Sequence, residues 1–155
     1  MNNDLAVLPA SKDDAPMLAE IRAESMRPSL EAIKRFDPVR VRERFLSTFI
    51  DKDTFLLYHK SEIAGFYVLR DYVDHLYLDH FYIKAKFQGY GIGREVMKRI
   101  QQHATACEKP IRLIALKKSP ANAFYLATGF IFQRAEDVDN YYCWFSTSAT
   151  GSANG

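Results

Sequence analysis

The spacing of apolar residues predicts a chain that alternates between strands and helices. Strand-like apolar runs, bounded by polar or turn-forming residues, occupy positions 5–8, 54–59, 63–69, 75–83, 111–116, 130–135 and 141–146. Apolar side chains that recur every three or four residues predict helices beginning near Pro16 and Pro38, each close behind an acidic residue, and another from Ile92 to Ala104. A short helix is expected between Pro120 and Gly129.

Several details of this pattern indicate how the strands pair. The runs at 54–59 and 63–69 are separated only by a short polar segment, which suits an antiparallel hairpin. The run at 111–116, IRLIAL, is almost continuously apolar, so we expect a strand that is buried on both faces and paired in parallel through the preceding helix. The last two strands are expected to flank a turn from Glu136 to Asn140. The pattern predicts an α/β fold.

Composition limits the number of domains and the kinds of partner. A chain of 155 residues, 48% of them apolar, suffices for one core, so one domain is predicted over 1–147 and a disordered tail over 148–155. The 21 basic and 19 acidic side chains give a net charge of +2, which supports neither nucleic acid nor a membrane surface as a partner. Without a leader pattern or a membrane-spanning apolar run, a cytoplasmic protein is expected.

Metal chemistry is not expected from this sequence. The two cysteines, Cys107 and Cys143, lie far apart and lack metal-ligand spacing, which also argues against a disulfide framework. His75, Asp79 and His80 cluster in one strand. Side chains on opposite faces of a strand cannot converge on one ion, so this cluster is not expected to bind a metal.

The stretch Gln88-Gly89-Tyr90-Gly91-Ile92-Gly93 joins a predicted strand to a predicted helix. The free N–H groups and the dipole of a helix N-terminus favour an anion, and glycine removes the Cβ that would keep a phosphate away from those donors. A plain tight turn is the alternative explanation. The chain has neither the GxxxxGK[ST] pattern of a Walker A loop nor the GxGxxG pattern of a Rossmann fold, so neither nucleotide class is supported.

The same stretch resembles the Gln/Arg-x-x-Gly-x-Gly/Ala signature of the GNAT family of acetyl-CoA-dependent N-acetyltransferases. A second segment, from Ser119 to Phe130, resembles that family's Ala-x-x-x-Tyr-x-x-x-Gly-Phe segment. The resemblance implies a single-domain, mixed, mostly antiparallel sheet with flanking helices. Its central parallel pair would splay open between the strand ending at Ile83 and the strand at 111–116.

The resemblance also implies acetyl-CoA as co-substrate, with the pantetheine arm in the splay and the pyrophosphate on the glycine-rich amides. Carried over position by position, the coenzyme contacts would be Phe81, Ile83, Gln88, Gly89, Tyr90, Gly91, Ile92, Gly93, Arg94, Asn122 and Tyr125. Tyr125 matches the family's general acid, since a phenol with a reference pKa of about 10 can protonate a departing thiolate. Packing on the short helix is the alternative role for Tyr125. The family often has asparagine where this chain has Lys118.

The general base is left open between two neighbours, Asp79 and His80. Family members often place a glutamate early in this strand, where the nearest equivalent is Tyr77. Histidine is a suitable base near neutral pH, whereas Asp79 would need a raised pKa or a relay water. A structural hydrogen-bonding role is the alternative for each.

The acceptor pocket is expected from the first two helices and the loop between them, SMRPSLEAIKRF, with Arg27, Glu31 and Tyr77 as substrate contacts. The resemblance implies transfer of acetyl to a primary amine of a small molecule or peptide by direct attack in a ternary complex. One alternative is a non-catalytic acyl-CoA-binding or sensing domain, and another is a plain protein-interaction module. An exposed edge at the last strands would allow a homodimer.

Overall fold

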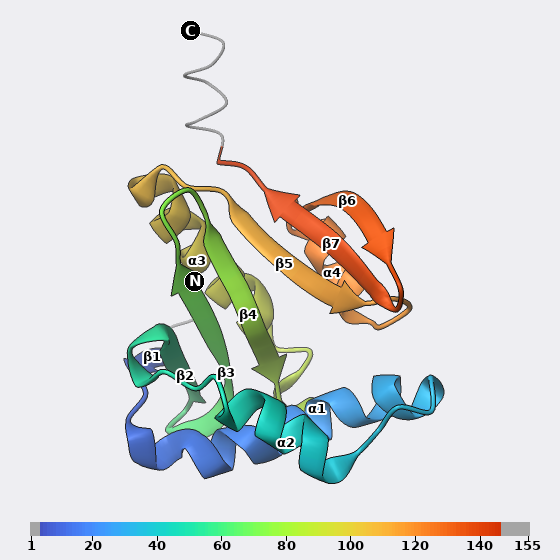
Figure 1. The fold of residues 1–155 in the computed structure, drawn as a ribbon. Helices are drawn as coiled ribbons and strands as arrows, with labels where there is room; N and C mark the ends of the chain where they lie inside the picture. The colour runs from blue at the N-terminus through green and yellow to red at the C-terminus, as the bar shows by residue number, and fades with distance from the viewer. Residues whose placement is uncertain (1–3, 147–155) are drawn as a thin grey trace, which may run out of the picture. The chain divides into compact units, whose positions relative to one another are not determined.

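The computed structural model describes residues 4–146, and within them a mixed sheet of seven strands carries helices (Figure 1). The strands are β1 (Leu5–Pro9), β2 (Thr54–His59), β3 (Glu62–Asp71), β4 (Leu76–Ile83), β5 (Ile111–Leu116), β6 (Ile131–Glu136) and β7 (Asp139–Trp144). The helices are α1 (Ala15–Ala32), α2 (Pro38–Leu46), α3 (Ile92–Cys107) and α4 (Ala121–Ala127), with short 3₁₀ turns η1 (Lys12–Asp14), η2 (Asp51–Asp53) and η3 (Ala85–Phe87).

The sheet order is β1-β2-β3-β4-β5-β7-β6, with β4 and β5 as its parallel pair. The pairs β1–β2, β2–β3, β5–β7 and β6–β7 are antiparallel. This confirms the predicted mixed α/β fold and the hairpin between β2 and β3. The tail predicted over 148–155 lies outside the described residues, and the domain boundary at 147 stays a prediction.

The chain divides into two compact units that both draw on β3 and β4. The first unit comprises Met1–Val68 and His80–Ile92, and the second comprises Leu69–Asp79 and Gly93–Gly155. Each unit therefore contains one part of the β3–β4 hairpin. The first unit holds α1 and α2, and the second holds α4 and almost all of α3.

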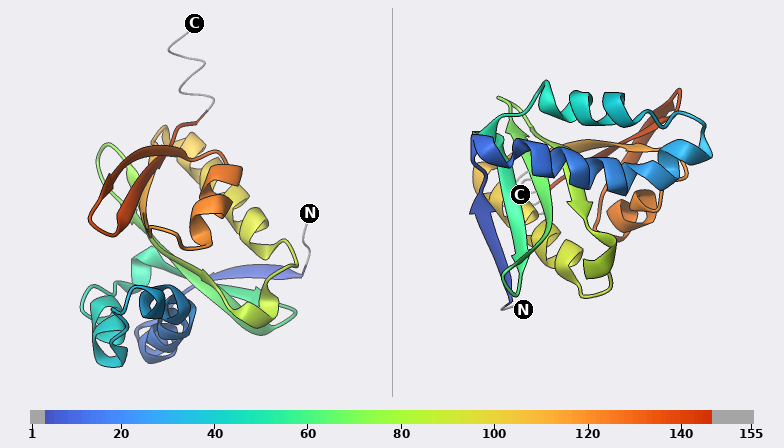
Figure 2. Two further views of the ribbon diagram at one scale, coloured as in Figure 1. Left: turned by 90° about the vertical axis from the view of Figure 1, so that its right-hand side faces the viewer. Right: turned by 90° about the horizontal axis from the view of Figure 1, so that it is seen from below.

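In the first unit, α1 and α2 run side by side against the strands (Figure 2). Their shared core consists of Leu18, Ala19, Ile21, Phe45, Leu56, Phe66 and Val68. The Phe45 and Phe66 rings meet edge to face, with centroids 5.2 Å apart. The start of α2 follows the sequence prediction, because the Asp37 carboxylate accepts hydrogen bonds from the amides of Val39 and Arg40 at 3.0 and 3.1 Å.

The prediction of a loop over SMRPSLEAIKRF is wrong for most of that segment. Helix α1 continues through Pro28 to Ala32, and the chain leaves the helix where Lys34 takes a φ of 58°. Proline removes one helical hydrogen bond, but Pro28 lies on the exposed part of α1, while the packed residues earlier in the helix hold its axis. The connection to α2 is therefore only about five residues, 33–37.

In the second unit, β5 is buried on one face only, which corrects the expectation for IRLIAL. Ile111, Leu113 and Ala115 are buried, whereas Arg112 and Ile114 are exposed, Ile114 by 38%. Helix α4 contacts β5 and is drawn behind β7 in Figure 1, so one face of this part of the sheet has a helix over it. Helix α3 faces inward with Val96, Met97, Ile100 and Ala104, all buried as the periodicity predicted.

The turn between the last two strands is also shorter than expected. Strand β6 extends to Glu136 and β7 begins at Asp139, so only Asp137 and Val138 connect them. All six residues of β6 are exposed, and β6 ends the strand order. The sequence analysis expected an exposed edge at the last strands, and the structure has one. The homodimer that such an edge would allow stays a prediction.

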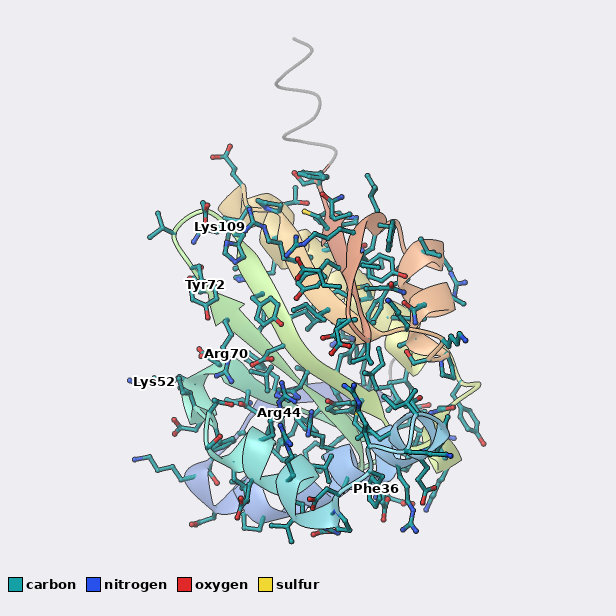
Figure 3. The ribbon with its side chains drawn as sticks, turned by 45° about the vertical axis from the view of Figure 1, so that its right-hand side comes forward. Phe36, Arg44, Lys52, Arg70, Tyr72 and Lys109 are labelled. Atoms are coloured by element: carbon teal, nitrogen blue, oxygen red, sulfur yellow. The ribbon has the colours of Figure 1, made fainter. Side chains whose placement is uncertain are left out.

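The tip of the β3–β4 hairpin is tied down by Lys109 (Figure 3). Its Nζ donates to the Asp71 carboxylate at 2.6 Å and to the Tyr72 carbonyl at 2.8 Å. The Tyr72 ring stacks on His75 with centroids 5.0 Å apart, and His75 Nδ1 lies 2.8 Å from the Asp74 carboxylate. These contacts give His75 local partners.

Within residues 4–146, no helix is long and apolar enough to cross a membrane.

Candidate active site

The glycine-rich stretch forms a loop that only glycine suits well at two positions. Gly89 and Gly91 have φ angles of 88° and 76°, in the left-handed region. A Cβ built on either glycine meets no atom within 4 Å, so the space above this backbone is open. Gly93 lies in the first turn of α3. The loop thus presents bare backbone immediately before a helix N-terminus, an arrangement suited to an anion.

Gln88, at the start of this loop, is engaged with the loop's own scaffold. Its Nε2 donates to the carbonyl of Ile83 at 3.0 Å, which ties the beginning of the loop to the end of β4. Arg94 lies in the first turn of α3. Gln88 therefore has a positioning role, and its coenzyme role stays a prediction.

His59 lies beside the loop, although no sequence motif predicts it there. His59, at the end of β2, packs its ring against Tyr90, 63% exposed, at 5.6 Å and against Phe87 at 6.0 Å. The Nδ1 of His59 is buried, and no hydrogen-bond partner is present for it in the described part of the chain. No spacing in the sequence links position 59 to position 90, so only the fold brings this imidazole to the loop.

In the middle of β4, Asp79 is held by an arginine from the neighbouring strand. The Asp79 Oδ2 accepts from Nε of Arg70 at 3.3 Å and from Nη2 at 3.1 Å, and Arg70 is labelled in Figure 3. The side chains of Arg70 and Asp79 are only 10% and 27% exposed, so this ion pair is largely desolvated. Asp79 therefore has a structural role whatever its chemical role.

Tyr77, two residues before Asp79, remains a neutral phenol over the physiological pH range. Burial, with the Asp79 carboxylate as the next cause, raises the pKa of Tyr77 to about 12, because both disfavour the phenolate. Where family members often have a glutamate, this chain thus presents an uncharged hydrogen-bonding group.

The parallel pairing of β4 with β5 is short. Within the described residues, the register joins Leu76 to Ile111 and Tyr77 to Arg112. The amide of Leu76 also donates to the carbonyl of Pro110 at 2.9 Å. The ladder thus ends soon after β4 begins, as a splayed parallel pair requires.

His80 lies in an aromatic surrounding in the first unit. It is 8% exposed, its Nδ1 lies 3.0 Å from the Tyr82 hydroxyl, and its ring centroid lies 5.3 Å from that of Phe45. Phe66 contributes a further ring at 6.5 Å. Asp79 and His80, the candidate bases, therefore have different partners.

On α4, Tyr125 is buried and packed among aromatic rings. It is 8% exposed, with ring centroids 5.6 Å from Phe130 and 6.2 Å from Tyr142. These contacts, edge to face with Phe130 and tilted with Tyr142, hold the ring in place. Both proposed roles of Tyr125, packing and proton donation, are consistent with this fixed ring.

Asn122, one turn earlier, is the centre of a hydrogen-bond network inside the second unit. Its Nδ2 donates to the Leu116 carbonyl at 2.7 Å and to the Ser119 carbonyl at 2.9 Å. Its Oδ1 accepts from the Tyr142 hydroxyl at 2.7 Å and from Asn140 at 3.0 Å. The side chain therefore ties the start of α4 to β5 and β7, a function that the sequence did not predict.

The proposed acceptor contacts on α1 pair with each other. Arg27 Nε lies 3.1 Å from the Glu31 carboxylate, with both side chains more than half exposed, and the Arg27 guanidinium lies 5.0 Å from the centroid of Phe36. An exposed pair of this kind contributes little to stability.

Within residues 4–146, no three histidine, cysteine or acidic side chains are grouped to hold a metal ion.

Comparison with known proteins identifies the family. A model of the acetyltransferase (GNAT) domain matches residues 24–147. The chain belongs to the GNAT family. Acetyl transfer is the general activity of this family, and the match spans the glycine-rich loop, β4 and α4. No curated protein sequence matches the chain significantly.

Solved structures of GNAT proteins share this fold. The PaiA N-acetyltransferase of Thermoplasma acidophilum, in complex with coenzyme A, is 18% identical with a TM-score of 0.75, covering 91% of this chain and 98% of its own. An acetyltransferase from Thermus thermophilus is 22% identical with a TM-score of 0.69, covering 92% and 97%. A GNAT family acetyltransferase from Elizabethkingia anophelis with acetyl-CoA bound is 16% identical with a TM-score of 0.66, covering 92% and 99%.

Proposed function

We propose that this GNAT protein transfers acetyl from acetyl-CoA to a primary amine by direct attack in a ternary complex. The observation that carries the proposal is the loop at Gly89 and Gly91, with left-handed backbone and open space just before α3. Coenzyme A and acetyl-CoA are bound in two structures of similar fold. Both observations support a coenzyme whose phosphates lie against bare amides.

The proposed coenzyme contacts are those that the family resemblance implies. The pyrophosphate would accept hydrogen bonds from amides between Gln88 and Gly93, with Arg94 adding positive charge, and the pantetheine arm would bond to the backbone of Phe81 and Ile83. Asn122 and Tyr125 would line the thioester end of the coenzyme. Since Asn122 already makes several bonds, we expect its main contribution to be the position of Tyr125.

The chemistry needs two proton movements. A neutral amine attacks the thioester carbonyl carbon, a C–N bond forms and the C–S bond breaks. The phenol of Tyr125 gives its proton to the departing sulfur, and the amine loses a proton to a base, for which Asp79 and His80 are the candidates. Arg27, Glu31 and the neutral phenol of Tyr77 would contact the acceptor.

The test is calorimetric titration with acetyl-CoA, with coenzyme A, ATP and NAD as controls. Micromolar binding of acetyl-CoA and coenzyme A alone would support the proposal. An absence of coenzyme binding would refute it and leave the glycines as a turn. Assays of acetyl transfer to a panel of amines then distinguish an enzyme from a sensor. Coenzyme binding without turnover would favour a non-catalytic acyl-CoA-binding function. That alternative is open because Tyr77 stands where family members often have a glutamate.

Substitution of Gly91 distinguishes a phosphate site from a plain turn. We expect Gly91→Asn to weaken acetyl-CoA binding at least about tenfold, near 1.4 kcal/mol, while the Tm changes little. Asparagine tolerates a left-handed φ, so the turn survives and only the open space is filled. Gly91→Ala is the matched variant, which strains the backbone as well. Wild-type affinity in Gly91→Asn would show that Gly91 serves only the turn.

A further inference from the structure

His59 has one ring nitrogen in the interior of the first unit and the other at its surface. Its Nδ1 is the buried side-chain atom of residues 4–146 for which no hydrogen-bond partner is present. No bond engages Nε2 in the same part of the chain, so Nε2 would share that description if it were buried too. Nε2 therefore lies at the surface, where a ligand can reach it. A buried polar atom without a partner is rare in folded proteins and calls for an explanation.

The contacts of His59 place this surface nitrogen beside the glycine-rich loop. The imidazole packs on Phe87, just before the loop, and on Tyr90, which stands between the two left-handed glycines. His59 ends β2 at a two-residue turn in which Lys60 and Ser61 have φ angles of 50° and 70°. A turn with two left-handed residues matches the twist of a hairpin and fixes where its strands end. The hairpin therefore holds the ring next to the loop.

The charges around His59 favour an anion. Lys60 follows it directly in the chain, and Lys84 and Lys86 precede the loop. Glu62, the acidic side chain beside them, accepts from Lys86 Nζ at 2.8 Å. This bond, with the charge of Lys84 as a weaker cause, lowers the pKa of Glu62, so these groups lie close together. Among the described residues around His59, lysines thus outnumber carboxylates, and a phosphate would meet a favourable potential.

We infer that His59 is a further coenzyme-binding residue, whose Nε2–H donates a hydrogen bond to a phosphate oxygen of the coenzyme beside the glycine-rich loop. The inference rests on the acetyl-CoA-dependent function proposed above. A phosphate selects the imidazole form with a proton on Nε2, and in the neutral ring that form leaves only a lone pair at Nδ1. A buried N–H without an acceptor is the rarer and more costly case. The donor thus faces the ligand, and the lone pair faces the interior.

Two substitutions separate phosphate binding from packing. Phenylalanine keeps a ring against Phe87 and Tyr90 but removes the donor, whereas glutamine loses the ring and places an amide N–H near the position of Nε2. We expect His59→Phe to weaken coenzyme A binding about tenfold in calorimetric titration, because the lost bond is to a charged group. His59→Gln should bind within about threefold of the wild type. If His59→Phe binds as tightly as His59→Gln or more tightly, the inference is overturned and His59 is a packing residue.

Chemical modification of the wild-type protein gives a test that needs no variant. Diethyl pyrocarbonate reacts with accessible imidazole nitrogens, and mass spectrometry of peptides locates the modified histidines. Coenzyme A should protect His59 from the reagent, while the exposed His103 on α3 should react equally with and without coenzyme A. A His59 that reacts undiminished at saturating coenzyme A would overturn the inference.

Dephospho-coenzyme A, which lacks the 3′-phosphate, shows which phosphate His59 binds. If the loss of affinity in His59→Phe disappears with this analogue, the partner is the 3′-phosphate, and if the loss persists, the partner is the pyrophosphate. A wild-type protein that binds no coenzyme would refute the proposed function itself. A wild-type protein that binds coenzyme A, with His59→Phe equal to it, would refute only the role of His59.

Discussion

Replacement of Tyr125 by phenylalanine is expected to lower kcat by about 10²- to 10⁴-fold and to leave the Kd for acetyl-CoA nearly unchanged. The ring is packed against Phe130 and Tyr142, so phenylalanine keeps the ring in place and removes the hydroxyl that would donate the proton. Without that donor, the thiolate must leave unprotonated or take a proton from water. Steady-state kinetics together with calorimetric titration would measure both quantities.

The matched control is Tyr72→Phe, which removes an exposed phenol in the same unit. This variant should behave as the wild type does in both assays. Circular dichroism and the Tm of Tyr125→Phe guard against a loss of fold. A folded Tyr125→Phe protein with wild-type kcat would remove Tyr125 from the mechanism and leave it as a packing residue of α4.

The substitution Gly65→Ala is expected to lower the free energy of unfolding by about 3 kcal/mol. A Cβ at this position would lie 2.0 Å from the Tyr82 carbonyl oxygen and 3.0 Å from its carbon. The obstacle is backbone, which cannot rotate away as a side chain would, so β3 and β4 must separate. At about 2–4 °C per kcal/mol, the Tm should fall by about 6–12 °C.

Gly91→Ala provides the comparison, since its Cβ would enter open space and only the left-handed φ costs energy, about 1–2 kcal/mol. Thermal unfolding of the two variants should therefore rank Gly65→Ala as the less stable. An equal or smaller loss at Gly65 would mean that the two strands adjust without cost and that their close approach is not required.

Local signals in the sequence carried most of the fold prediction. The Asp37-Pro38 pair marks the start of α2, the polar residues after His59 mark a hairpin, and the alternate glycines mark a bare loop before α3. Each of these depends on residues within one or two turns of each other. The resemblance to the GNAT family rests on motifs of the same short range, and the family model confirms it over residues 24–147.

The predictions that failed depend on contacts between distant residues. Pro28 stays inside α1 because the earlier part of that helix is packed, and Ile114 is exposed because burial depends on what lies over each face of β5. Arg22 donates to the Tyr82 hydroxyl from 60 positions away, and Asn122 bonds to residues 18 and 20 positions away. No spacing rule connects such pairs, so the bonds of His80 and Asn122 could be read only from the fold.

The division of the β3–β4 hairpin between the two units has a consequence for synthesis on the ribosome. The first unit needs His80–Ile92, and the second begins at Leu69, so the two are interleaved along the chain. A nascent chain that has emerged only as far as Val68 still lacks the part of β4 that belongs to the first unit. Neither unit can be released intact by a single cut, and we expect deletion of either β1 or β7 to impair the whole protein.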